Sequence, residues 1–259
     1  MQQKEQKWQL DESSRKLEKI KEEIQQLSKP LGPSTSDAEF VLENYEKTLH
    51  RLQDLNERLQ SIKPLSSFLD MYNNLLEKYS ETIQQVQDKL AKAKQSFSMR
   101  DQYHTLVKEI NETVYTCYEN LNNVNEETLP SDMKLKKYQT ILDDITQCEA
   151  TYTKASDKGE QIAKEGTASD CNKIMEELQR LRSKLNELRK AVNNEKTQHE
   201  HLIAEQKKYM QELDNILGGL RNGMSIMQSQ PLLKLPSKDV QKEISKHKEQ
   251  ASELRKMSE

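Results

Sequence analysis

The stretch that decides the fold is residues 65–129, LSSFLDMYNNLLEKYSETIQQVQDKLAKAKQSFSMRDQYHTLVKEINETVYTCYENLNNVNEETL, which lie between Pro64 and Pro130. It contains neither glycine nor proline, whereas average usage would place about eight such residues in a window of this length. A single helix of this length would extend about 95 to 100 Å at 1.5 Å per residue, far beyond the width of a compact domain. The stretch therefore predicts a long helix that no single globular core can bury.

The apolar residues of this stretch form two successive seams. In the first half they recur at alternating steps of three and four residues, the spacing of a helix in a coiled-coil-like bundle. That seam consists of Leu69, Tyr72, Leu76, Tyr79, Ile83, Val86, Leu90, Ala93 and Phe97. Continuing its register would put Arg100 and His104 in the seam, but the apolar residues resume at Tyr103, Val107 and Ile110. The buried face is therefore predicted to rotate near 98–102, as in a helix that serves two successive bundles.

The composition fits long amphipathic helices. The 259 residues are 33% hydrophobic and 32% charged, and a disordered chain of this polarity would have no reason to keep heptad spacing. The 40 basic and 43 acidic residues are interspersed and give a net charge of -3, which predicts no broad field for nucleic acid or for an anionic membrane. No apolar run approaches the roughly 18 residues of a membrane span, so direct membrane insertion is not expected.

Proline and glycine divide the rest of the chain into further helices. A first helix is expected over 2–28, and a second starts at a capping box formed by Ser36 and Glu39. A middle helix follows Pro130 and ends at a loop near 163–168. The next begins at Ile174 and keeps one register to Leu220, diluted by polar residues near Glu195.

Three glycines weaken the end of that helix. Gly218, Gly219 and Gly223 each cost about 1 kcal/mol relative to alanine, so an early helix end or a frayed segment is expected, with a functional hinge as the alternative. Pro231 and Pro236 mark the next loop, before a final helix.

The helices group into repeating units of three. The expected boundaries are 1–97, 98–197 and 198–259, and the last unit lacks its third helix. The sequence LPS at 129–131 recurs at 235–237, 106 residues later, and such a period is typical of an array. The predicted fold class is all-α, with tandem three-helix bundles joined by continuous helices into an elongated rod. Flexible points are expected near Ser98 and Glu195.

These features resemble the spectrin repeat, a three-helix unit of similar period whose third helix runs into the next unit. The local match is Asp239-Val240, Ile244, His247-Lys248 and Glu253-Leu254, which is similar to the start of a spectrin middle helix. Spectrin repeats usually carry a core tryptophan in the first helix, but Trp8 is the one tryptophan of this chain. That sparse-tryptophan pattern is similar to divergent repeats of giant cytoskeletal linkers, nesprins in particular and also plakins and dystrophin.

The resemblance implies a structural protein of the cytoplasm and cytoskeleton, a monomeric spacer and scaffold that binds other proteins through its helical faces. A nesprin-like segment would belong to a linker between the outer nuclear membrane, or nuclear envelope, and the cytoskeleton. The actin-binding and membrane-anchoring ends of such linkers have no counterpart in these 259 residues. The alternative is a dimeric membrane-curvature-binding helical module, against which the mixed charge and the repeat period count.

No residue pattern predicts catalysis, a cofactor or a metal site. Phosphate-loop, dinucleotide-binding and nucleophile-elbow motifs are missing from the sequence. His199 and His201 are two residues apart, which directs them about 200° apart on a helix. Cys117, Cys148 and Cys171 have no paired spacing, and the first two occupy seams, where a reduced cysteine behaves as a small apolar residue. We therefore expect a non-enzyme of a reducing compartment.

The unfinished third unit predicts a protein-contact surface. Without a third helix, an apolar groove should remain along the last two helices, lined by Leu213, Ile216, Leu220, Val240, Ile244 and Leu254. Two interpretations stay open: the chain is part of a longer protein, or it ends naturally with a groove for a partner helix.

Overall fold

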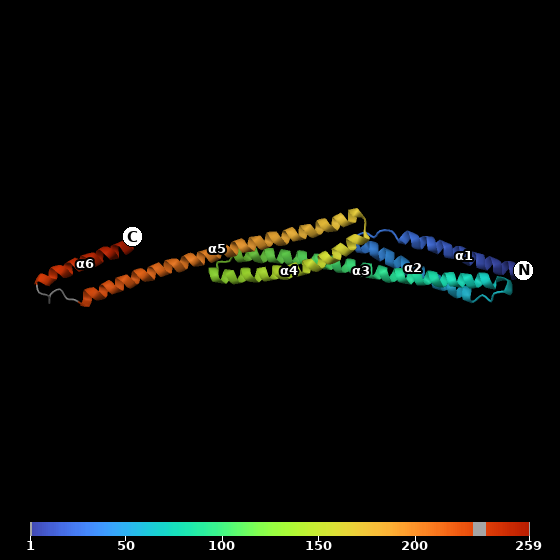
Figure 1. The fold of residues 1–259 in the computed structure, drawn as a ribbon, viewed down its shortest axis with the longest axis horizontal. Coiled ribbons are helices and arrows are strands. Elements are labelled where there is room, and N and C mark those ends of the chain that lie inside the picture. The colour runs from blue at the N-terminus through green and yellow to red at the C-terminus, as the bar shows by residue number, and fades with distance from the viewer. Residues whose placement is uncertain (1, 230–236, 259) are drawn as a thin grey trace. The chain divides into compact units, whose positions relative to one another are not determined.

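The computed structural model describes residues 2–229 and 237–258. Within them the chain forms long helices and no strand (Figure 1). The helices are α1 (Gln2–Leu27), α2 (Thr35–Gln60), α3 (Leu69–Glu126), α4 (Ser131–Glu165), α5 (Ala168–Ser229) and α6 (Ser237–Ser258), with a short 3-10 helix η1 (Ser66–Phe68) before α3. The helices pack against one another in bundles, which confirms the predicted all-α fold class.

The chain divides into two compact units. The first is built from residues up to 120 and from 141 to 190, and the second from 121 to 140 and from 191 onward. The predicted repeat boundaries at 97 and 197 describe three-helix bundles rather than these compact units. The first predicted bundle and most of the second lie together in the first unit. Those boundaries stay a prediction.

In the first unit, α1, α2 and the first half of α3 share one hydrophobic core. Its fully buried members include Leu10, Leu17, Ile20, Leu52, Leu59, Tyr79 and Val86, which come from all three helices. The hydroxyl of Tyr79 donates a 2.9 Å hydrogen bond to the carbonyl oxygen of Ser13, so the polar end of this core residue is satisfied. Burial raises the pKa of Tyr79 to about 12. Most of the first predicted seam therefore faces this core, as Tyr79, Val86 and Ala93 show. Its start was wrong, because Leu69 is 45% exposed and Leu75 rather than Leu76 is the fully packed leucine.

The next part of α3 packs with α4 and the beginning of α5 in the same unit. Gly159 of α4 shows how closely the three helices approach, because a Cβ there would lie 3.0 to 3.1 Å from Ile174, Leu178 and Tyr103. The hydroxyl of Tyr103 donates a 2.7 Å hydrogen bond to Glu177 of α5. One uninterrupted helix thus contributes to two successive cores, as the two seams predicted.

The start of α2 differs from the prediction. Ser34 is the N-cap, with an extended backbone and a side chain that accepts a 3.1 Å hydrogen bond from the amide of Ser36. The predicted capping box at Ser36 and Glu39 was wrong, because Ser34 directly after Pro33 offers the same cap two residues earlier. The helix therefore begins at Thr35.

α5 continues to Ser229, so the predicted early end near its three glycines was also wrong. Gly218, Gly219 and Gly223 lie inside the helix, and no described glycine has a positive φ. The cost of these glycines is entropic, and adding a residue to an existing helix is far easier than starting one, so a local penalty need not end it. Fraying and a hinge stay predictions, and the loop with Pro231 and Pro236 lies outside the described residues.

Candidate functional site

Arg100 of α3 is among the largest fully buried side chains of the described chain, with a relative exposure of 0%. It lies in the first unit, at the point where the buried face of α3 passes from one core to the next. A buried guanidinium is costly unless its charge is paired and its donors are bonded. The groups around Arg100 therefore decide whether its burial stabilises or destabilises this part of α3.

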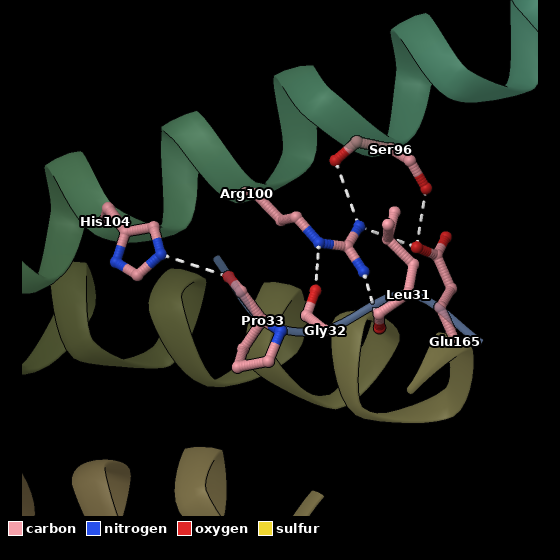
Figure 2. Close-up of polar contacts among 7 residues, drawn as sticks. All are labelled: Leu31, Gly32, Pro33, Ser96, Arg100, His104 and Glu165. Carbon is pink, nitrogen blue, oxygen red and sulfur yellow. Dashed lines mark hydrogen bonds and ion pairs between the residues drawn. The ribbon is translucent and has the colours of Figure 1, made fainter. Parts of the chain in front are cut away.

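The guanidinium of Arg100 is bonded to three parts of the unit (Figure 2). Nε donates to the carbonyl oxygen of Gly32 at 2.8 Å, and Nη2 donates a longer bond of 3.4 Å to that of Leu31. Nη1 donates to Glu165 Oε2 at 2.7 Å and to the carbonyl oxygen of Ser96 at 3.2 Å. The Ser96 hydroxyl donates to the same Glu165 oxygen at 2.5 Å. We refer to these five residues as the Arg100 network.

Further contacts join the same segments without the arginine. The amide of Leu31 donates a 3.1 Å hydrogen bond to the carbonyl oxygen of Glu165, at the end of α4. His104 Nε2 lies 3.2 Å from the carbonyl oxygen of Pro33 (Figure 2). A Cβ at Gly166 would lie 3.1 Å from the carbonyl oxygen of Leu31, so the loops approach closely here because Gly166 has no side chain. The loop between α1 and α2 is thus held against both α3 and the end of α4.

The local sequence explains why this loop needs the arginine. Pro30 and Pro33 have no amide hydrogen and prevent a regular helix between them, so the carbonyl groups of Leu31 and Gly32 have no helical partners. The last carbonyl groups of α4 are likewise unpaired within their own helix. A guanidinium presents five donors in one plane and suits such a mixture of carbonyl and carboxylate acceptors.

In the second unit, the start of α4 contacts the side of α5. His199 Nδ1 of α5 lies 3.1 Å from the hydroxyl oxygen of Ser131, at the start of α4. The His199 ring lies 5.7 Å from the ring of Tyr138 between centroids. Burial raises the pKa of Tyr138, and Glu195 raises it further. We refer to Ser131, Tyr138 and His199 as the His199 contact.

α4 also satisfies the end of α3 in this second unit. The Tyr138 hydroxyl donates to the side-chain oxygen of Asn125 at 2.7 Å, and Lys134 Nζ donates to the carbonyl oxygen of Asn125 at 3.1 Å. The Lys134 side chain thereby places a positive charge at the carboxyl end of α3, where the helix dipole favours it. Lys134 thus helps to close the end of α3.

The predicted protein-contact residues are accessible where their side chains are described. Leu213, Leu220 and Ile244 are 49%, 42% and 41% exposed, and Ile216 and Val240 are half-buried. Leu254 lies in α6, but its side chain is outside the described part of the structure. Nearby exposed apolar residues of α5 are Leu202, Tyr209, Met210, Leu217 and Met224. The second unit also has a hollow of about 630 Å³ whose lining includes Ile203 and Met210.

Arg100 was not predicted as a site residue. In the sequence it looks like a break in the first seam, since a charged residue in a core position is normally excluded. The available signal was its register position together with the carbonyl-rich loop at 30–33. His199 and His201 separate as predicted, since His199 faces Ser131 while His201 Nδ1 lies 3.7 Å from Glu205.

No group of three or more His, Cys, Asp or Glu residues in the described part of the chain could hold a metal ion. None of the helices described is both long and apolar enough to span a bilayer.

Comparison with known proteins gives one informative similarity. The chain is 29% identical over 256 residues to Muscle-specific protein 300 kDa of Drosophila melanogaster, and the match covers 97% of this chain. It spans 2% of the length of that relative, which is therefore a very large protein. No model of a protein family matches, and no solved structure matches. Similarity to a very large muscle protein and an all-helical fold together fit a structural role.

Proposed function

We propose that this chain is a structural spacer and tether, a protein-interaction segment of a cytoskeletal linker. The observation that supports this proposal is α3, one helix that serves two successive cores of the first unit. Two bundles that share a helix have no flexible loop between them at that point, so load passes through helix hydrogen bonds and packed side chains. Such a segment keeps a distance and transmits force.

The Arg100 network supports a stiff connection. Bending α3 near Ser98 would pull the guanidinium away from Glu165 and from the loop carbonyl of Gly32. Arg100 is fully buried while Glu165 is 36% exposed, so separating them costs mainly the lost hydrogen bonds of the guanidinium, about 2 to 3 kcal/mol in total. The sequence-based expectation of flexibility near Ser98 is therefore replaced in this proposal by stiffness there, while flexibility near Glu195 remains part of it.

The cellular setting follows from the family resemblance. A nesprin-like segment would lie in the cytoplasm, with cytoskeletal proteins as partners, between the outer nuclear membrane and the cytoskeleton. Similarity over nearly the whole chain to a very large muscle protein is compatible with such a linker. The nuclear-envelope and actin connections rest on the resemblance alone.

The accessible apolar residues of α5 and α6 are the proposed protein-contact surface. In the first unit, seam residues such as Leu17, Leu52 and Tyr79 are fully buried, because three helices cover one another. Leu213 and Leu220 keep the same kind of spacing but remain about half exposed, so a further helix has apolar surface to cover. Hydrogen exchange tests this surface: protection of 200–229 and 237–258 equal to that of 141–190 in a monomer would contradict it.

Small-angle X-ray scattering with in-line light scattering tests the spacer function. The proposal expects a monomer of 30.3 kDa. Its maximum dimension should be roughly 110 to 150 Å, from the helix rise. A dimer that co-sediments with anionic vesicles at low salt would contradict the proposal and favour the membrane-curvature module.

A further inference from the structure

Two cysteines line one cavity in the first unit. The cavity has a volume of about 340 Å³ and lies between α3 and α4. Cys117 of α3 and Cys148 of α4 both line it, and their relative exposures are 2% and 4%. The surrounding side chains include the small Thr113, Thr116 and Thr151, which leave the hollow unfilled. The two thiols therefore share one space at a helix interface.

The side chain of Cys148 reaches across to α3. Its Sγ lies 4.0 Å from the carbonyl oxygen of Ile110, which is two turns before Cys117 in the same helix. Burial is the main reason why the pKa of Cys148 is raised to about 11, and the charge of Cys117 raises it further. Burial also raises the pKa of Cys117, and Asp144 raises it further.

The two reactions to compare for these thiols are metal binding and disulfide formation. No described group of three or more possible ligands could hold a metal ion here. A disulfide needs the two sulfur atoms to approach to about 2.05 Å with a dihedral angle near 90°. Both side chains border the same cavity, so the approach of the two sulfur atoms would take place within it.

We propose that Cys117 and Cys148 form a redox modification site, at which peroxide converts the two thiols into a disulfide that links α3 to α4. In the first step hydrogen peroxide oxidises one thiol to a sulfenic acid and is itself reduced to water. In the second step the sulfur of the other cysteine attacks the sulfenic sulfur, forms the S–S bond and releases a second water. The thiols lose two electrons in total, and the peroxide gains them.

The disulfide would hold α3 and α4 together. It closes the chain between residues 117 and 148, so α3 and α4 cannot separate at this point when the bundle is pulled or partly unfolded. The raised pKa of both thiols leaves little thiolate at neutral pH, so oxidation is slow in the resting bundle and speeds up when the bundle opens. The site thus responds to oxidant and to loading together, which goes beyond the spacer function.

The test uses the full chain with Cys171→Ser, so that the pair is the only source of thiols. Hydrogen peroxide is added in buffer and in mild urea, followed by mass spectrometry without reduction. We expect a loss of about 2 Da and a peptide that joins the two cysteines, formed faster in urea. The matched control, Cys117→Ser in the same background, should form no such peptide.

Stability provides the second measurement. The oxidised chain should unfold at a temperature several degrees higher than the reduced chain, and dithiothreitol should reverse the shift. Sulfenic or sulfinic acids without a linked peptide, links only between molecules, or an oxidised chain that unfolds at a lower temperature would each overturn the proposal. None of these results depends on whether the chain acts as a spacer.

Discussion

The Arg100 network and the His199 contact each join a long helix to a segment that packs against its side. In the first unit the loop before α2 contacts the side of α3, and in the second unit the start of α4 contacts the side of α5. The first uses a fully buried, permanently charged guanidinium with a carboxylate and three carbonyl acceptors. The second uses an imidazole beside one hydroxyl and one aromatic ring.

The difference indicates that two contacts on the sides of long helices need not be equally strong. A buried charge loses several favourable bonds at once when it is displaced, whereas a neutral hydrogen bond contributes about 1 kcal/mol. The first connection should therefore resist bending and the second should yield first. Helical continuity alone does not decide this, because both long helices are unbroken.

Removing the guanidinium should have the largest effect. Arg100→Met should destabilise the first unit by about 2 to 3 kcal/mol, because the buried carbonyl groups around the guanidinium lose their donor. The carboxylate of Glu165, whose side chain is 36% exposed, can return to water. Hydrogen exchange should rise at 28–34 and 96–104, and urea unfolding gives the magnitude. The control is Arg51→Met, whose exposed pair with Glu23 should contribute at most about 1 kcal/mol. Equal effects of the two substitutions would remove the distinction between the sites.

Gly159→Ala tests the close packing of the first unit. The new methyl group would lie 3.0 to 3.1 Å from Ile174, Leu178 and Tyr103. Overpacking of this kind should cost about 1 to 3 kcal/mol, measured by urea unfolding. A neutral result would mean that the three helices can move apart easily there.

His199→Ala probes the weaker connection. It should cost about 1 kcal/mol in the second unit, through loss of the Ser131 hydrogen bond and of the contact with Tyr138. Local hydrogen exchange at 131–138 is the measurement. His201→Ala is the matched control, because His201 is exposed and should be nearly neutral. A cost equal to that of Arg100→Met would contradict the proposed ranking.

Gly218→Ala should stabilise the second unit. A Cβ at Gly218 would meet nothing within 4 Å, and the helix has no need of a positive φ there. We expect a gain of about 0.5 to 1 kcal/mol from the lower entropy of the unfolded chain, opposite in sign to Gly159→Ala. Loss of stability would indicate contacts at Gly218 that this structure lacks.

The smallest expected effect is a pH dependence at the start of α5. Hydrogen bonds from Thr167 lower the pKa of Asp170 below its ordinary value of 3.8. A pKa that is lower in the folded state stabilises the fold above the unfolded value, and this stabilisation is lost as the pH falls through the folded value. NMR titration should show Asp170 protonating below 3.8, and an ordinary midpoint would contradict the bonded geometry.

The fold was largely predictable because the apolar spacing of the long stretch is regular. Tyr79 and Val86 lie in one core and Tyr103 and Ile110 in the next, where the two seams placed them. The end of α5 was not predictable from local propensity, since cooperative helix growth outweighed the cost of Gly218 and its neighbours. Ser34 was missed because Ser34 and Ser36, two residues apart, offer similar caps.

The candidate site was much less predictable. Arg100 interrupts an apolar seam, and its burial depends on acceptors at Leu31, Gly32 and Glu165, which are more than 60 residues away in sequence. No local pattern links these positions. Their arrangement follows only from the packing of α3 against α4 and the loop after α1.

The most direct test of the stiff connection is to pull single molecules of the wild-type chain and of Arg100→Met by their ends. The first unit of the wild-type chain should yield in one cooperative event, because its two cores share α3 and are joined by the Arg100 network. In Arg100→Met the same unit should yield in two separate events at lower force. Identical single events at equal force in both chains would contradict the claim that the buried arginine couples the two cores.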